Sequence, residues 1–265
     1  AEVSVARLFM AGAVPGLLLV VLFMGYTALW AKLSPKSVPQ DTRHFTWADK
    51  FKAIRNLIPV LSLIIFVLGS IYTGLTTPSE AAAFGALGVL ILAAVFKCLT
   101  IEAMRKSIVG ALRVTLMAYL IVFGSATFSQ LLAFSGASRG LVSWATSFDL
   151  APLAMLLVMF AVLLLLGMFM EQISMMLLTV PIFFPLAHSL GFDPIWFGLI
   201  MLLALEISFT TPPFGLLLFV MKGVAPRGTT MKTIYTSAFP FIGCSLLLVA
   251  LLIAFPQLAL WLPSF

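Results

Sequence analysis

Long apolar runs constrain this chain more than any other feature. They cover residues 15–30, 57–72, 81–96, 153–170 and 243–255, and each approaches the roughly 20 residues that a helix needs to cross a bilayer. A barrel strand would alternate apolar and polar residues over about 10 positions, and these runs do not alternate. Because the chain is 62% hydrophobic and only 9% charged, lipid must solvate much of it. The sequence predicts a multi-pass, all-α integral membrane protein.

Basic residues predict the topology. They gather in short segments at 32–55, 97–113 and 222–232, which the positive-inside rule places on the cytoplasmic side. Their place in loops between apolar runs accounts for the net charge of +6 without nucleic acid as a partner. About six crossings follow, at 6–29, 57–75, 79–96, 108–134, 195–221 and 233–256, with an outer segment at 135–148. Phe45, Trp47, Phe51 and Ile54 are interspersed with charged residues over 45–56, which suits an amphipathic helix lying on the inner surface.

The segment 150–187 is too short to cross the membrane twice. Two full crossings need about 40 residues plus a turn, and the flanking loops lie on the same face. We therefore expect a re-entrant helical hairpin that turns inside the membrane at Gly167 to Gln172.

Two consecutive prolines, Pro212 and Pro213, remove two backbone donors from an apolar helix. Non-helical backbone at membrane depth is tolerated only inside protein or beside a watery cavity. Half-helix ends with free carbonyls suit Na⁺, and those with free amides suit carboxylates. A proline kink satisfied by neighbouring helices is the alternative. The candidate ion or substrate ligands at this break are Ser208, Thr210, Thr211, Pro212, Pro213 and Gly215.

Carboxylates flanked by apolar residues are functional candidates by default. Glu171, beside Gln172 at the hairpin tip, either serves the site or caps a helix N-terminus, and a structural role is favoured for Glu206. Glu80 follows Thr76, Thr77 and Pro78 at a helix start, where capping explains it.

Small and polar residues also interrupt the run around Gly124 and Ser125, where close helix packing competes with a binding role. Cys98 and Cys244 lie far apart and neither pair with each other nor suggest a metal site. No nucleophile elbow, phosphate loop or dinucleotide motif is present, so we expect neither an enzyme nor a resident cofactor.

Several of these strings resemble the large membrane subunit (DctM/SiaM-like) of tripartite ATP-independent periplasmic (TRAP) transporters. They begin with Leu8-Phe9-Met10-Ala11-Gly12 and Val14-Pro15-Gly16, and the second runs from Tyr72 to Ala83 as YTGLTTPSEAAA. The others are Gly167-Met168-Phe169-Met170-Glu171 and Thr211-Pro212-Pro213-Phe214-Gly215.

The resemblance implies half of an elevator-type carrier of the ion-transporter superfamily. Residues 1–29 would be the last helix of a first repeat and 30–56 a cytoplasmic loop with an interfacial helix. Residues 57–134 would be scaffold helices, and 135–265 the hairpin, broken helix and closing helix. A first repeat would then reside elsewhere, on a separate chain or in a part outside this sequence.

The implied activity is Na⁺-coupled import of organic acids, of C4-dicarboxylate or sugar-acid type, across a bacterial inner membrane. The implied partners are a small TRAP membrane subunit and a periplasmic substrate-binding protein.

Three positions depart from the family's common pattern. Ala204 stands where Asn is frequent, Ser208 where Gly is frequent, and Leu217 where Asn is frequent. These changes motivate a second hypothesis, in which the chain is a transporter relic that serves as a structural subunit of a larger membrane complex. A membrane enzyme is a distant third, because no acid, base or nucleophile set is assembled.

Overall fold

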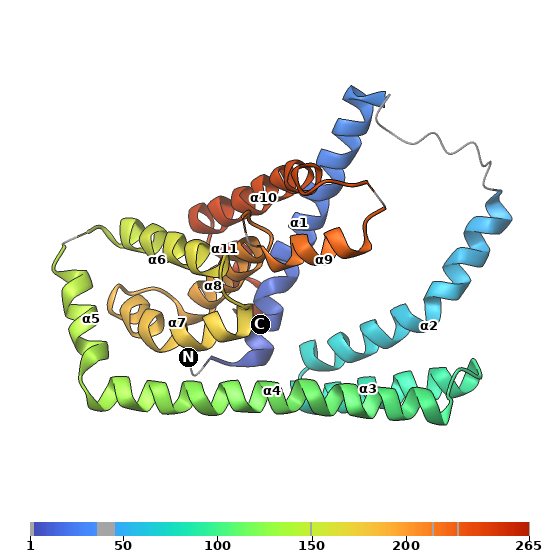
Figure 1. Cartoon of the computed structure of the whole chain (residues 1–265), viewed down its shortest axis with the longest axis horizontal. Helices are drawn as coiled ribbons and strands as arrows, with labels where there is room; N and C mark the ends of the chain where they lie inside the picture. The colour runs from blue at the N-terminus through green and yellow to red at the C-terminus, as the bar shows by residue number, and fades with distance from the viewer. Residues whose placement is uncertain (1–2, 36–45, 149, 214, 227, 265) are drawn as a thin grey trace. The chain divides into compact units, whose positions relative to one another are not determined.

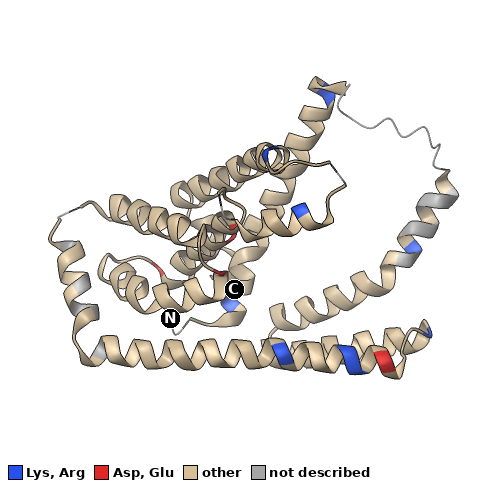
Figure 2. Ribbon diagram, viewed as in Figure 1, with Lys and Arg blue, Asp and Glu red and all other residues tan. Residues whose placement is uncertain are grey.

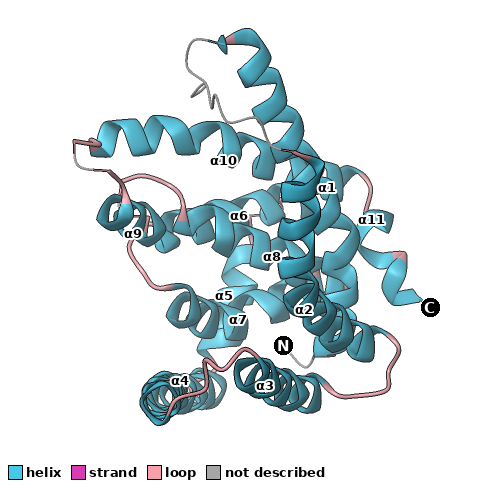
Figure 3. Cartoon of the chain, turned by 90° about the vertical axis from the view of Figure 1, so that its right-hand side faces the viewer, coloured by secondary structure: helices cyan, strands magenta, loops and turns pink. Residues whose placement is uncertain are grey.

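The computed structural model describes residues 3–35, 46–148, 150–213, 215–226 and 228–264, and all of its regular elements are helices. Figures 1 and 3 show the helices in two views. The elements are α1 (Val5–Leu33), α2 (Trp47–Tyr72), α3 (Pro78–Val95), α4 (Ile101–Phe134), α5 (Ala137–Thr146), α6 (Pro152–Gly167), α7 (Gln172–Ser189), α8 (Pro194–Phe209), α9 (Leu216–Val224), α10 (Met231–Ala254), α11 (Gln257–Leu260) and the short 3₁₀ turn η2 (Leu262–Ser264).

The predicted all-helical membrane fold is confirmed. Within the described ranges, five helices are long and apolar enough to cross a bilayer: α1, α3, residues 101–132 of α4, α7 and α10. Shorter apolar helices are α6, α8 and the Leu57–Tyr72 part of α2. Lys, Arg, Asp and Glu positions are sparse along the ribbon in Figure 2. The protein is therefore an integral membrane protein.

The chain divides into two compact units, each described here by itself. The first comprises Ala1–Leu29 and Leu116–Phe265, and the second comprises Trp30–Thr115. Helix α8 is the centre of the first unit and packs against α6, α7, α10 and α11. Phe197, Ile200 and Ala204 are almost inaccessible, so α8 is buried on most of its surface.

Polar residues begin the helices of the first unit at the expected places. The Asp193 carboxylate accepts hydrogen bonds from the backbone N–H groups of Ile195 (2.8 Å) and Trp196 (3.0 Å), and Pro194 occupies the first turn of α8. The Thr230 hydroxyl accepts from Thr233 N–H (3.2 Å) at the start of α10. These caps satisfy donors that a helix start leaves free.

Two carbonyls that prolines leave without their usual donor are paired with side chains of other helices. Pro181 lies four residues after Leu177 in α7, and the Leu177 carbonyl accepts from the Ser125 hydroxyl of α4 (2.8 Å). Pro256 lies four residues after Leu252, and the Leu252 carbonyl accepts from the Trp196 indole (2.9 Å). An unpaired carbonyl in an apolar surrounding is costly, so each side chain fixes a helix contact.

The second unit contains α2, α3 and the first part of α4. A Thr77–Glu80 capping box begins α3: Thr77 N–H donates to the Glu80 carboxylate (2.8 Å), and Glu80 N–H donates to the Thr77 hydroxyl (3.4 Å). The Thr76 hydroxyl donates to that of Ser70 (2.9 Å), which ties the turn to α2. The expected capping role of Thr77 and Glu80 therefore agrees with the geometry.

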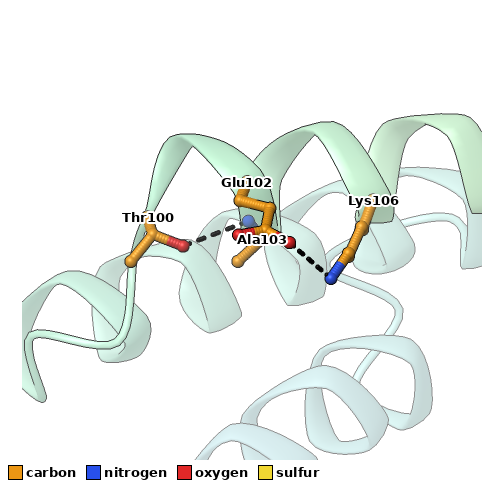
Figure 4. A network of polar contacts seen from close by, with 4 residues as sticks. All are labelled: Thr100, Glu102, Ala103 and Lys106. Carbon is orange, nitrogen blue, oxygen red and sulfur yellow. Dashed lines mark hydrogen bonds and ion pairs between the residues drawn. The ribbon is translucent and has the colours of Figure 1, made fainter.

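Polar contacts also define the start of α4 (Figure 4). The Thr100 hydroxyl accepts from Ala103 N–H (3.1 Å), and Lys106 pairs with Glu102 one turn earlier (2.6 Å). This helix begins at Ile101, seven residues before the expected start, and spans 34 residues.

Two segments differ from the sequence-based expectations. Residues 47–56 are continuous with the spanning part of α2 and are not a separate helix. Much of the outer segment 135–148 is helical, as α5, and its Val142 and Ala145 pack against the apolar core. Residues 36–45 of the basic segment, which include Phe45, and residue Phe214 lie outside the described residues.

Candidate functional site

Helices α6 and α7 form a helical hairpin with a short tip, and its turn inside the membrane stays a prediction. Helices α6 and α7 are joined by residues 168–171, where the Leu166 carbonyl accepts from Phe169 N–H and Met170 N–H (both 3.0 Å). The Glu171 carboxylate accepts from Ser174 N–H (3.1 Å) at the start of α7. Glu171 thus caps the helix, which was one of the two roles considered for it.

The predicted interruption after α8 is also present. Helices α8 and α9 are separated by residues 210–215. The hydroxyls of Thr210 (2.9 Å) and Thr211 (2.6 Å) both donate to the Ile207 carbonyl at the end of α8. The Pro213 carbonyl accepts from the Tyr235 hydroxyl of α10 (2.8 Å). The break is therefore supported by side chains on both sides.

Gly215 is required where the chain folds back on itself. A Cβ at this position would lie 2.8 Å from the Phe209 carbonyl oxygen and 2.9 Å from that of Thr211. Both atoms belong to the backbone and cannot rotate away. The absence of a side chain at Gly215 lets α9 begin directly beside the end of α8.

The structure brings the hairpin tip and the broken helix together. The Gln172 side-chain amide donates to the Leu205 carbonyl and to the Glu206 carboxylate, each at 3.3 Å. A Cβ on Gly167 would collide with the side chain of Ser208, so the end of α6 approaches α8 as closely as a glycine allows. Two segments separated by more than 30 residues in sequence form one cluster.

Ser208 occupies a position enclosed by this cluster. Its side chain is completely buried, and its hydroxyl donates to the Leu205 carbonyl (2.7 Å). The Ser208 hydroxyl hydrogen is thus used within α8. The Ser208 side chain fits here because Gly167, which packs against it, has no side chain. Ser208 stands where the family commonly has glycine, and the residue that it packs against, Gly167, is itself a glycine.

The other candidates lie elsewhere. Gly124 and Ser125 belong to α4, and Ser125 borders a groove of about 770 Å³ beside α7. That groove is lined by Ser129, Pro181, Phe184, Pro185 and His188 among others, none of which belongs to the tip or the break. Thr76, Thr77, Pro78 and Glu80 lie in the second unit and are described with it.

Tyr235 and Leu205 were not predicted as members of the site. Tyr235 is in the first turns of α10, 22 residues after Pro213, and no local pattern connects the two. A tyrosine near the polar end of an apolar helix is a weak signal by itself. The Leu205 contribution is its backbone carbonyl, which carries no sequence signal.

The donor set suits a hard cation. It consists of carbonyl oxygens, the Thr210 and Thr211 hydroxyl oxygens and the exposed Glu206 carboxylate. Both threonine hydroxyls donate their hydrogen to the Ile207 carbonyl, so each oxygen keeps lone pairs for a cation. Na⁺ favours such oxygen ligands over nitrogen or sulfur. Among the described residues, no buried side-chain nitrogen or oxygen lacks a hydrogen-bond partner.

Comparisons with known proteins concern nearly the whole chain. Residues 1–258 match the family described as "Tripartite ATP-independent periplasmic transporter, DctM component". The C4-dicarboxylate TRAP transporter large permease protein of Pseudomonas aeruginosa is 34% identical over 99% of this chain and 61% of its own length. The sialic acid TRAP transporter large permease protein of Vibrio cholerae is 31% identical over 98% of this chain and 60% of its own. The chain thus spans about three-fifths of the length of these relatives.

Proposed function

Because this chain belongs to the DctM component family of TRAP transporters, we propose that it forms part of the permease of a Na⁺-coupled importer of organic acids. The resemblance deduced from the sequence motifs is confirmed by this match and by the relatives. Those relatives are permease subunits, which is consistent with a protein that is not an enzyme.

The observation that carries the proposal is the contact between the hairpin tip and the break in α8. Two interrupted helical elements meet through Gln172, Leu205 and Glu206, and each presents backbone that is not part of a helix. Secondary transporters bind ions and substrates at such interruptions, where helix ends supply carbonyls and amides. In this arrangement Thr210 and Thr211 would supply oxygen ligands to Na⁺.

The relatives and the charge of helix ends support an organic acid as the substrate class. The relatives named above transport C4-dicarboxylates and sialic acid by their names, and both are carboxylates. The N-terminal turns of α7 and α9 lie at the tip and at the break, and helix N-termini favour negative charge. We expect partners of the family type, a small membrane subunit and a periplasmic binding protein, in a bacterial inner membrane.

Uptake into proteoliposomes tests the proposal. The chain is reconstituted with the remaining permease segment, the small subunit and the binding protein, and uptake of a radiolabelled C4-dicarboxylate or sialic acid is measured under a Na⁺ gradient and under K⁺. Na⁺-dependent uptake is expected. No uptake of either acid with every component present would contradict the proposal.

Two threonines test the position of the ion site, Thr211 as the variant and Thr229 as its control. Thr211 donates to Ile207 (2.6 Å) and Thr229 donates to Pro226 (2.9 Å), each to a carbonyl a few residues earlier. Thr211→Val should raise the Na⁺ concentration for half-maximal uptake by about tenfold, as loss of a ligand or of its orienting partner does at other metal sites. Thr229→Val, away from the break, should leave that concentration unchanged.

A structural subunit is the second candidate. The 18-residue window of α4 that best fits a membrane span has none of its residues buried in the described structure, so this helix has a large apolar surface for lipid or for another protein. Purification under native conditions distinguishes the permease role from the structural role. Stable isolation with an unrelated membrane complex, and without a binding protein or small subunit, would favour the structural role.

A further inference from the structure

Gln172 is the residue that connects the two parts of the candidate site. It is the first residue of α7, and its side-chain amide donates to the Leu205 carbonyl and to the Glu206 carboxylate (3.3 Å each). Its neighbour Glu171 is engaged with Ser174 inside the hairpin. Gln172 therefore reaches out of the hairpin, whereas Glu171 stabilises it from within.

We infer that Gln172 is a positioning residue whose amide holds the hairpin tip on α8 through the Leu205 carbonyl and the Glu206 carboxylate. The inference deepens the proposed function, on which its consequence for transport rests. The contact itself is a property of the folded chain and can be measured without transport.

The chemistry of the pair explains why an amide is suited to this position. Glu206 lies one turn before the end of α8 and is exposed, whereas its chain neighbours Leu205 and Ile207 are buried. A carboxylate with a hydrogen-bond donor beside it is better solvated than one without. A lysine would neutralise the negative charge, whereas the glutamine amide provides the donor and leaves that charge available to a cation.

The close packing beside this pair makes the contact sensitive to position. Gly167 ends α6 and fits against the buried Ser208 without room for a Cβ. Such a fit holds only while the tip stays in place on α8. Loss of the Gln172 hydrogen bonds should therefore separate Gly167 from Ser208 as well. The hairpin tip would then no longer be held against α8.

Exchanging the two partners provides a direct test. Gln172→Glu places two carboxylates opposite each other, which repel. Adding Glu206→Gln restores an amide opposite a carboxylate, with donor and acceptor exchanged between the helices, but the Leu205 carbonyl stays without its donor from position 172. Glutamine and glutamate have nearly the same volume, so a change in packing does not contribute to the effect of Gln172→Glu.

Thiol labelling at the tip reports the contact. In a full-length background with Cys98→Ser and Cys244→Ala, Met168→Cys introduces a half-buried reporter in the turn. The reporter is labelled with a membrane-permeant maleimide in detergent or lipid nanodiscs. The control is Gln257→Glu, because Gln257 is also the first residue of a helix and is exposed.

Gln172→Glu should accelerate labelling about fivefold, which corresponds to about 1 kcal/mol for a lost, partly exposed hydrogen bond to a charged group. The doubly exchanged variant regains one of the two hydrogen bonds and should be labelled at least about twofold more slowly than Gln172→Glu. Gln257→Glu should be labelled at the starting rate. An unchanged rate in Gln172→Glu, or a double variant that labels as fast as the single one, would overturn the inference. If labelling behaves as expected and the reconstituted system takes up no organic acid, the proposed function fails and the contact stands.

Discussion

The Ser125 hydroxyl should matter only because Pro181 is present. Pro181 has no N–H to donate to the Leu177 carbonyl, and Ser125 donates to it instead at 2.8 Å across 52 residues of sequence. Ser125→Ala would leave that carbonyl unpaired in an apolar setting. Because side-chain hydrogen bonds between membrane helices contribute about 0.6 kcal/mol on average and up to about 1.7, we expect a loss of about 1 kcal/mol of unfolding free energy.

Pro181→Ala tests the cause. Alanine restores the backbone N–H, which can donate to Leu177 four residues earlier as in a regular helix. In this background Ser125→Ala should cost less than half of what it costs in the original chain. The coupling free energy of the double-mutant cycle is then about 0.5–1 kcal/mol.

Unfolding in mixed micelles measures all four proteins of the cycle. The free energy is obtained from helical circular dichroism during titration with a denaturing detergent. Ser129→Ala is the matched control, because Ser129 lies one turn further along α4 and beside the same groove, and it should give no coupling with Pro181→Ala. Equal costs of Ser125→Ala in the two backgrounds would refute the explanation.

Two further predictions concern other contacts of the first unit. Trp196→Phe removes the donor to the Leu252 carbonyl and should cost about 1–2 kcal/mol, seen as a lower melting temperature in detergent; a loss no larger than that of the exposed Trp144→Phe would contradict it. Gly167→Ala should cost about 1–3 kcal/mol by collision with Ser208, and Ser208→Gly should recover most of it in the double variant. If the double variant does not recover stability, the collision with Ser208 is not the cause of the loss at position 167.

Local signals in the sequence were sufficient to predict the end of α8, the start of α3 and the turn between α6 and α7. Pro212 and Pro213 cannot continue a helix, and α8 ends at Phe209. Thr77, Pro78 and Glu80 form a start signal whose atoms lie within four residues, and the capping box is present. The short length of residues 150–187 indicated a hairpin, and α6 and α7 turn at 168–171. Each of these features depends on the backbone chemistry of adjacent residues.

Contacts between distant segments were not predictable in the same way. The Gln172–Glu206 and Ser125–Leu177 pairs depend on how helices are rotated and shifted against each other, and nearly uniform apolar sequences carry little information about rotation. Helix α5 was missed for a related reason. Its serines and glycine favour helix weakly, and the packing of Val142 and Ala145 against the core compensates.

Hydrogen exchange with and without Na⁺ tests the central claim most directly. The reconstituted permease is compared in Na⁺ and in K⁺ at equal ionic strength, and amide exchange is followed by mass spectrometry in residues 168–174, 209–216 and 240–252. If the hairpin tip and the break form one ion site, Na⁺ should slow exchange in the first two segments together and leave the third unchanged. Slowing in neither segment, in a preparation that shows Na⁺-dependent uptake, would contradict the claim that these two interruptions bind the ion.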